Sequence, residues 1–186
     1  MNCWKSIDIS RQYGLHRITL VSFIITLLSF IVLFLTFSLI YNDTTVSSSN
    51  FGWFILGLAG MFTMHKLCHV LPLIATKNQV KLRWKLKCYM PYMKIKTKKP
   101  FTKIQSYAVL LAPFAIITTA CILLAHIFPD YYHYFSMLAA VNIGLSIPDF
   151  LYIQLIQRAP NKCQIEELEN GYDILIINES RNEIAS

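Results

Sequence analysis

Charged residues are scarce in this sequence, making up 15% of its 186 residues, and acidic residues are the scarcer kind, with 10 Asp and Glu against 17 Lys and Arg. Hydrophobic residues account for 55% and the mean hydropathy is +0.46, which is too apolar for an ordinary soluble domain. The hydrophobic residues also come in long blocks separated by polar stretches. This composition predicts an integral membrane protein.

Several other features are missing. The five cysteines include no Cys-x-x-Cys pair, and their scatter argues against a disulfide framework. The N-terminal segment has no small-residue cleavage site, and the apolar run after it is too long for a secretory signal. The sequence has no internal repeat and no low-complexity segment, which argues against a repeat architecture.

Four apolar runs are long enough to cross a bilayer, for which a helix needs about 20 residues. We expect an all-α integral membrane protein with four transmembrane helices, at residues 19–41, 51–76, 107–128 and 134–156. These helices form a membrane domain, residues 19–157, between an N-terminal segment, residues 1–18, and a tail, residues 158–186.

Ten of the 17 Lys and Arg lie between Lys77 and Lys103, a stretch without Asp or Glu. Because this stretch lies between two predicted spans, we interpret it as a cytoplasmic loop, residues 77–106, that faces anionic lipid headgroups and binds no nucleic acid. The loops on the other side, residues 42–50 and 129–133, contain no Lys or Arg. The positive-inside rule therefore predicts a multi-pass protein of the cell membrane with both termini cytoplasmic.

Polar and apolar residues alternate at residues 79–87 and 92–97, which is the period of a half-buried strand. With Pro91 interrupting between them, we expect a small basic β-hairpin in the cytoplasmic loop. In the tail we expect a short acidic segment, a turn at Asn170-Gly171, and a short C-terminal strand.

Two histidines, His65 and His69, lie four residues apart in the second span. On a helix they point to the same side, one turn apart. Their spacing is that of the metal-binding histidines in the His-Glu-x-x-His signature of zinc peptidases. Lys66 stands where that signature has its catalytic glutamate.

Asp149 is the only acidic residue inside an apolar segment, and an intramembrane carboxylate is by default a functional-site hypothesis. Two histidines and one carboxylate form a catalytic zinc ligand set with an open fourth position. Asn142 and Ser146 lie on the preceding turns and extend a polar stripe, so Asn142 is a candidate polar stabiliser. We predict a zinc site made by His65, His69 and Asp149.

The residues and their layout resemble the membrane zincin peptidases of bacteria, a family related in design to site-2 proteases. The resemblance covers about residues 51–177. Its elements are the His-x-x-x-His pair, a basic strand-forming loop with a Pro-Tyr and a Lys-Pro-Phe, Ala112-Pro113, Asn142-x-x-x-Ser146-x-x-Asp149, and Arg158-Ala159-Pro160. It implies that His65, His69 and Asp149 are metal ligands and that the residue after the first histidine is the general base.

A glutamate at that position accepts a proton from zinc-bound water. A charged lysine has no acceptor, and its charge beside a dication weakens metal binding. The leading hypothesis is therefore a degenerate zincin-like metallopeptidase homologue, a pseudoenzyme that binds a metal, a membrane peptide or protein partner, or both. The alternatives are an active intramembrane zinc peptidase with Lys66 as a non-standard base, and a metal-handling or transport-associated protein.

Three alternatives remain for the site itself. The two histidines could bond only to backbone or to polar residues of neighbouring spans. Lys66 and Asp149 could form a buried ion pair in place of a metal. Met61, Met64 and Cys68 could add soft ligands that suit copper, although a methionine stripe more often serves packing.

Overall fold

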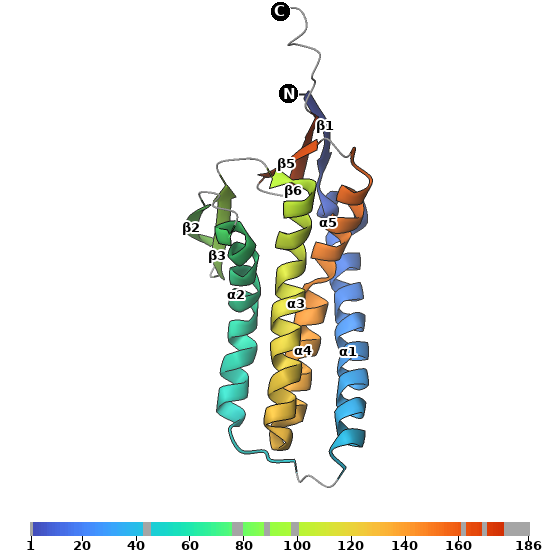
Figure 1. The fold of residues 1–186 in the computed structure, drawn as a ribbon, viewed down its shortest axis with the longest axis vertical. Helices are drawn as coiled ribbons and strands as arrows, with labels where there is room; N and C mark the ends of the chain where they lie inside the picture. The colour runs from blue at the N-terminus through green and yellow to red at the C-terminus, as the bar shows by residue number, and fades with distance from the viewer. Residues whose placement is uncertain are drawn as a thin grey trace, which may run out of the picture.

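The computed structural model of the chain describes residues 2–42, 46–75, 80–87, 90–97, 101–160, 163–168 and 171–176. Its helices stand side by side as an elongated bundle (Figure 1). They are α1 (Leu15–Ile40), α2 (Phe51–Ala75), α3 (Lys103–Ile127), α4 (Tyr132–Leu145) and α5 (Ile147–Gln157). Four helical segments are long and apolar enough to cross a membrane, which confirms the predicted membrane architecture.

The third span begins earlier than predicted, at residue 103 and not at 107. Its start is determined by a capping box at Thr102, whose hydroxyl accepts the backbone N–H of Gln105 at 3.3 Å. The Gln105 side-chain oxygen in turn accepts the backbone N–H of Thr102 at 3.1 Å. These two bonds satisfy backbone N–H groups that would otherwise have no partner at the start of the helix. The helix therefore begins at polar residues, which a span predicted from hydropathy leaves out.

The fourth span was predicted as one helix but consists of two, with a break at Ser146 between α4 and α5. Pro148, near the start of α5, has no N–H for the carbonyl of Gly144, and its ring would collide with that carbonyl in a continuous helix. At the break, the carbonyl of Asn142 accepts both the backbone N–H of Ser146 at 3.0 Å and the Ser146 hydroxyl at 2.9 Å. The break places Asp149 in the first turn of α5.

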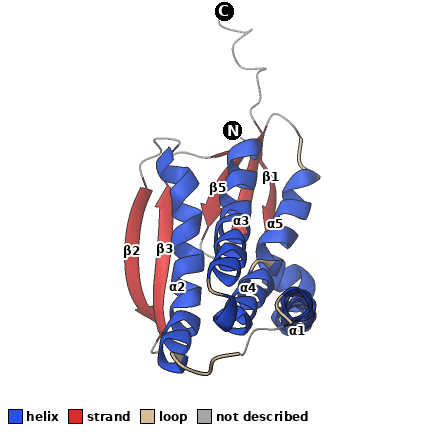
Figure 2. Ribbon diagram, turned by 60° about the horizontal axis from the view of Figure 1, so that its bottom comes forward, coloured by secondary structure: helices blue, strands red, loops and turns tan. Residues whose placement is uncertain are grey.

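The helices α3 and α4 occupy the middle of the bundle, with α2 packed on α3 and α1 packed on α4 (Figures 1 and 2). The outward surface is rich in apolar side chains, such as Leu28 on α1 and Leu56 on α2, which are 54% and 61% exposed. Such a surface suits contact with lipid, where apolar side chains need no cover from the protein.

A four-stranded antiparallel sheet lies at one end of the bundle (Figure 1). Its order is β1-β6-β5-β4, from strands β1 (Asn2–Ile7), β4 (Phe101–Thr102), β5 (Cys163–Leu168) and β6 (Gly171–Ile176). The predicted C-terminal strand is confirmed as β6. The acidic segment before it is itself the strand β5, and the N-terminal segment contributes β1, which the sequence analysis did not foresee.

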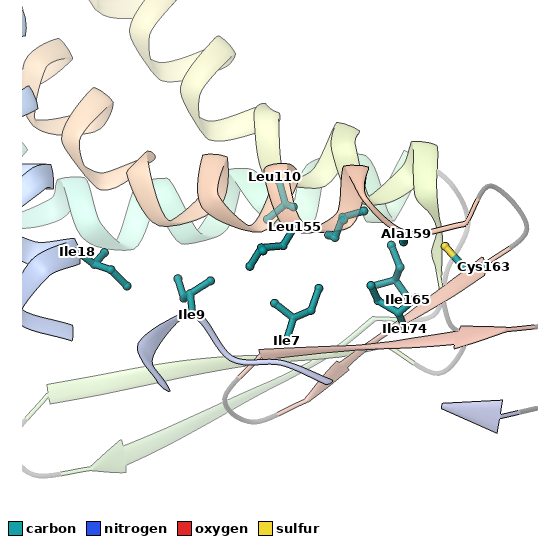
Figure 3. Close-up of a cluster of buried hydrophobic side chains, with 10 residues drawn as sticks. Ile7, Ile9, Ile18, Leu110, Leu155, Ala159, Cys163, Ile165 and Ile174 are labelled. Atoms are coloured by element: carbon teal, nitrogen blue, oxygen red, sulfur yellow. The ribbon is translucent and has the colours of Figure 1, made fainter. Parts of the chain in front are cut away.

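An apolar cluster joins this sheet to the helices (Figure 3). Ile7 of β1, Ile165 of β5 and Ile174 of β6 are 0–2% exposed and meet Leu110 of α3 and Leu155 of α5. Because these five side chains come from both ends of the chain and from two spans, their burial attaches both terminal strands to the same end of the bundle.

The predicted basic hairpin is confirmed as the antiparallel strands β2 (Val80–Lys87) and β3 (Met90–Thr97). Pro91 does not interrupt it but lies within β3, opposite Leu86. A two-stranded sheet consists only of edge strands, where a proline removes no ladder hydrogen bond that the sheet requires. The hairpin lies beside the end of α2 that is nearer the four-stranded sheet (Figure 1).

Candidate metal centre

The structure brings together His65, His69 and Asp149, the three residues that the sequence analysis named as ligands. One ligand atom from each lies within 4.8 Å of the other two. The Asp149 Oδ2 atom is 3.1 Å from Nε2 of His65 and 3.6 Å from Nε2 of His69. All three side chains are largely buried, with exposures of 8% for His65, 15% for His69 and 14% for Asp149.

Two helices supply the cluster. On α2 the two imidazole rings are one turn apart, with ring centroids separated by 5.2 Å. Asp149 comes from the first turn of α5, where the helix dipole stabilises negative charge. The break in the fourth span therefore provides a favourable place for a carboxylate at membrane depth.

Asn142 on α4 orients His65. Its side chain is fully buried, and its Nδ2 group donates to the carbonyl of Pro113 at 3.1 Å and to the hydroxyl of Thr118 at 3.0 Å. A carbonyl only accepts, so Nδ2 must face Pro113 and Oδ1 must face the other way. Nδ1 of His65 lies 2.9 Å from Oδ1 and therefore donates to it, which leaves Nε2 of the neutral ring as the acceptor that faces Asp149.

His69 is oriented in the same sense by α3. Its Nδ1 lies 2.8 Å from the backbone carbonyl of Val109. Because that partner is also an acceptor, Nδ1 carries the proton and Nε2 carries a lone pair. In their neutral form, both histidines thus direct the Nε2 lone pair toward the Asp149 carboxylate.

Three acceptors in one largely buried place repel one another unless a cation or a proton lies among them. This donor set fits a zinc ion, because zinc commonly takes two imidazoles and one carboxylate with a fourth position open. Ligand atoms at tetrahedral zinc distances are roughly 3.3–3.6 Å apart, close to the separations between Asp149 and the two histidines. In the described part of the chain, no other group of three His, Cys, Asp or Glu side chains comes together in this way.

Lys66 does not belong to the cluster. Its side chain is partly buried, and its ammonium lies 4.3 Å from the ring centroid of Phe62, one turn back along α2. A cation over an aromatic face is attracted by the ring quadrupole. The Lys66 ammonium therefore lies toward the end of α2 that is away from His69. It has the Phe62 ring as a partner, whereas the ion-pair alternative requires the Asp149 carboxylate as its partner.

The soft-ligand stripe is not assembled around the histidines. Met61 and Cys68 are buried in a packing cluster with Ile117 and Cys121, whereas Met64 is 55% exposed. A methionine and a cysteine that pack among apolar side chains serve the core. The geometry therefore gives no support to a copper site.

The sequence analysis missed two groups at the centre, namely the Val109 carbonyl and the Thr118 hydroxyl. No side-chain pattern marks a backbone carbonyl as an acceptor, and Thr118 resembles any other threonine of an apolar helix. The one available signal was Pro113, because a proline inside a helix releases the carbonyl four residues before it.

A comparison with protein-family models matches residues 58–164 to the family described as "Putative zincin peptidase". The matched region contains His65, His69, Asn142 and Asp149, and it leaves α1 outside. No curated protein and no solved structure matches the chain. Because the match covers more than half of the 186 residues, the chain belongs to this zincin peptidase family.

Proposed function

We propose that the protein is a membrane-embedded zincin homologue that binds zinc through His65, His69 and Asp149 and has lost the ordinary peptidase reaction. The observation that carries this proposal is the convergence of two Nε2 lone pairs on one carboxylate, with each Nδ1–H held by an acceptor behind it. Hydrogen bonds of this kind orient histidine ligands in metal sites.

The loss of peptidase activity follows from Lys66. Bound zinc would supply a Lewis acid and an acidified water, but peptide hydrolysis also needs a base to take the proton from that water. A charged lysine cannot accept a proton, and the Lys66 ammonium is placed over the Phe62 ring. Asn142 is held by Pro113 and Thr118 and serves His65, so it provides orientation and no replacement base.

Without turnover, the centre would serve to hold a membrane peptide or protein partner. We place the protein in the cell membrane with both termini in the cytoplasm. Because β1 and β6 pair in one sheet, the two termini lie on the same side of the membrane in this proposal. The basic hairpin lies near the same end of the bundle (Figure 1), which supports the cytoplasm as that side.

The hairpin is the part that we propose to lie on anionic headgroups. Its register pairs Lys81 with Lys96 and Arg83 with Lys94, so the two strands bring basic residues opposite one another. Trypsin should cut this loop more slowly in nanodiscs of anionic lipid than in nanodiscs of neutral lipid, and salt should remove the difference. Equal cleavage rates in the two lipids would contradict this placement.

Metal analysis of the purified protein tests the central claim. The wild type should hold close to one zinc per chain, and the double variant His65→Ala, His69→Ala should hold none. His126→Ala is the matched control, because His126 bonds to Tyr41 at the end of α3 remote from the centre. No zinc in the wild type, or equal zinc in the double variant, would reject the metal site.

Peptidase assays on a transmembrane peptide test the loss of activity. The wild type should not cleave the peptide, and Lys66→Glu should gain measurable cleavage because the missing base is restored. Cleavage by the wild type that disappears in Asp149→Asn would instead establish an active peptidase with a non-standard base.

A further inference from the structure

His69 is held by a backbone carbonyl that an uninterrupted helix would not offer. In an α-helix the carbonyl of each residue accepts the N–H of the residue four positions later. For Val109 that residue is Pro113, which lies inside α3 and has no N–H. The released carbonyl of Val109 accepts the Nδ1–H of His69 at 2.8 Å.

The same proline is connected to the other histidine. The carbonyl of Pro113 accepts the amide of Asn142 at 3.1 Å, and Asn142 in turn accepts the Nδ1–H of His65 at 2.9 Å. Pro113 is almost completely buried, so its carbonyl cannot readily exchange its partner for water. One residue thus lies behind both imidazoles.

We propose that Pro113 is a positioning residue of the metal centre. By removing one helical N–H it leaves the Val109 carbonyl to fix the protonated nitrogen of His69, and through its own carbonyl it fixes the amide of Asn142. The result is that both Nε2 atoms face Asp149. This inference deepens the proposed function and rests on it, because a role in positioning the histidines serves zinc binding.

A second proline provides the comparison. Pro72 lies inside α2 and by the same rule releases the carbonyl of Cys68. The described hydrogen bonds of the two histidines do not involve that carbonyl. Pro72→Ala therefore adds a backbone N–H inside a helix near the centre without altering the acceptor that holds His69.

The first experiment observes the tautomer of His69 without any metal. In ¹⁵N-histidine spectra of the metal-free protein in micelles at pH 8, His69 of the wild type and of Pro72→Ala should be protonated at Nδ1. In Pro113→Ala the new backbone N–H competes for the Val109 carbonyl, so His69 should lose this single tautomer. Pro113→Ser introduces the same N–H with a different side chain and should give the same result.

The second experiment measures zinc affinity and metal-free thermal stability. Loss of a hydrogen bond behind a ligand weakens metal binding about 10- to 100-fold, so we expect at least a 10-fold loss in Pro113→Ala and none in Pro72→Ala. The metal-free Tm of Pro113→Ala should change little, because the variant regains a helical hydrogen bond while His69 loses one. A purely structural role for Pro113 would lower both quantities.

An unchanged His69 tautomer in both Pro113 variants would overturn the inference, whatever the zinc affinity. Equal losses of zinc affinity in Pro113→Ala and Pro72→Ala would also overturn it, since a general bend would then be responsible. If the wild type shows the expected tautomer but binds no zinc, the proposed function fails while the positioning role of Pro113 stands.

Discussion

The side-chain oxygen of Asn142 lies 2.9 Å from Nδ1 of His65 and determines which nitrogen of that ring faces Asp149. This contact joins α4 to α2 across 77 positions of sequence. It is also fully buried on the asparagine side, so water cannot replace it. The orientation of the His65 ring is therefore built into the packing of the spans.

Replacing Asn142 by leucine should impair both stability and metal binding. The variant leaves the Pro113 carbonyl and the His65 Nδ1–H without their partner, and each unpaired buried group costs about 1–3 kcal/mol. Zinc affinity should fall roughly 10- to 100-fold. Chemical unfolding and competition with a zinc chelator measure the two effects.

Thr118→Val is the matched control for this variant, because it removes one acceptor of Asn142 and leaves the bond to His65 in place. We expect a smaller loss of stability and a zinc affinity within about threefold of the wild type, a change of less than roughly 1 kcal/mol. Equal zinc affinities for Asn142→Leu and the wild type would show that Asn142 does not orient His65.

Gly144 allows α4 to approach α1. A Cβ atom at this position would collide with the Thr26 hydroxyl and would lie 2.9 Å from the Ser22 carbonyl. Gly144→Ala should therefore push the two helices apart and lower the free energy of unfolding by about 1–3 kcal/mol. Gly60→Ala is the control, since open space surrounds Gly60, and it should be neutral or stabilising by up to about 1 kcal/mol.

The thiol of Cys163, on β5, should react slowly. Burial under the sheet raises the pKa of this thiol, against a weaker lowering by the charge of Lys103. At a given pH the folded protein thus holds less of the reactive thiolate than an exposed cysteine would. In a variant that keeps only Cys163, alkylation should reach its half-maximal rate at a higher pH when the protein is folded than when it is denatured.

The same shift has a consequence for stability. A raised pKa means that the unfolded chain loses the thiol proton first, so the contribution of Cys163 to stability is complete below the unfolded pKa and decreases as the pH rises above it. Lys103→Met should raise the pKa further. Identical pH profiles in folded and denatured protein would contradict the burial of the thiol.

The spans could be predicted because the bilayer imposes a minimum length of apolar sequence on every crossing helix. The sheet could not, because β1 and β6 pair across nearly the whole chain and β4 has only two residues. Neither terminal segment contains a sequence pattern that shows that the two segments pair with each other. Local pattern was sufficient for the hairpin, whose two strands are neighbours in sequence, and for β6 as a single strand, but not for the partners of β6.

At the metal centre, the helical period placed His65 and His69 on one side of α2, and the cost of an intramembrane carboxylate singled out Asp149. The sequence did not show that Asp149 reaches the histidines, because that contact depends on how α2 packs beside the fourth span and on the helix break at Ser146. The support from Val109 was equally hidden, because it depends on a carbonyl that is released by a proline on another helix.

Asp149→Asn should change the stability of the metal-free protein and its stabilisation by zinc in opposite directions. In the metal-free protein with both imidazoles neutral and Nδ1–H donating to Asn142 and Val109, Oδ2 of Asp149 and the two Nε2 atoms that face it are all acceptors. An asparagine can offer an N–H to one of those lone pairs, so at pH 8 the metal-free variant should be more stable than the wild type by about 1 kcal/mol. Zinc stabilises the wild type by about 2.7 kcal/mol at a concentration of 100 Kd, and the variant should lose most of this effect. Thermal unfolding with and without zinc measures both changes, with Asp130→Asn, at the opposite end of the fourth span, as the control. If the variant is less stable than the wild type without metal and equally stabilised by zinc, Asp149 is a structural partner of the histidines and not a ligand.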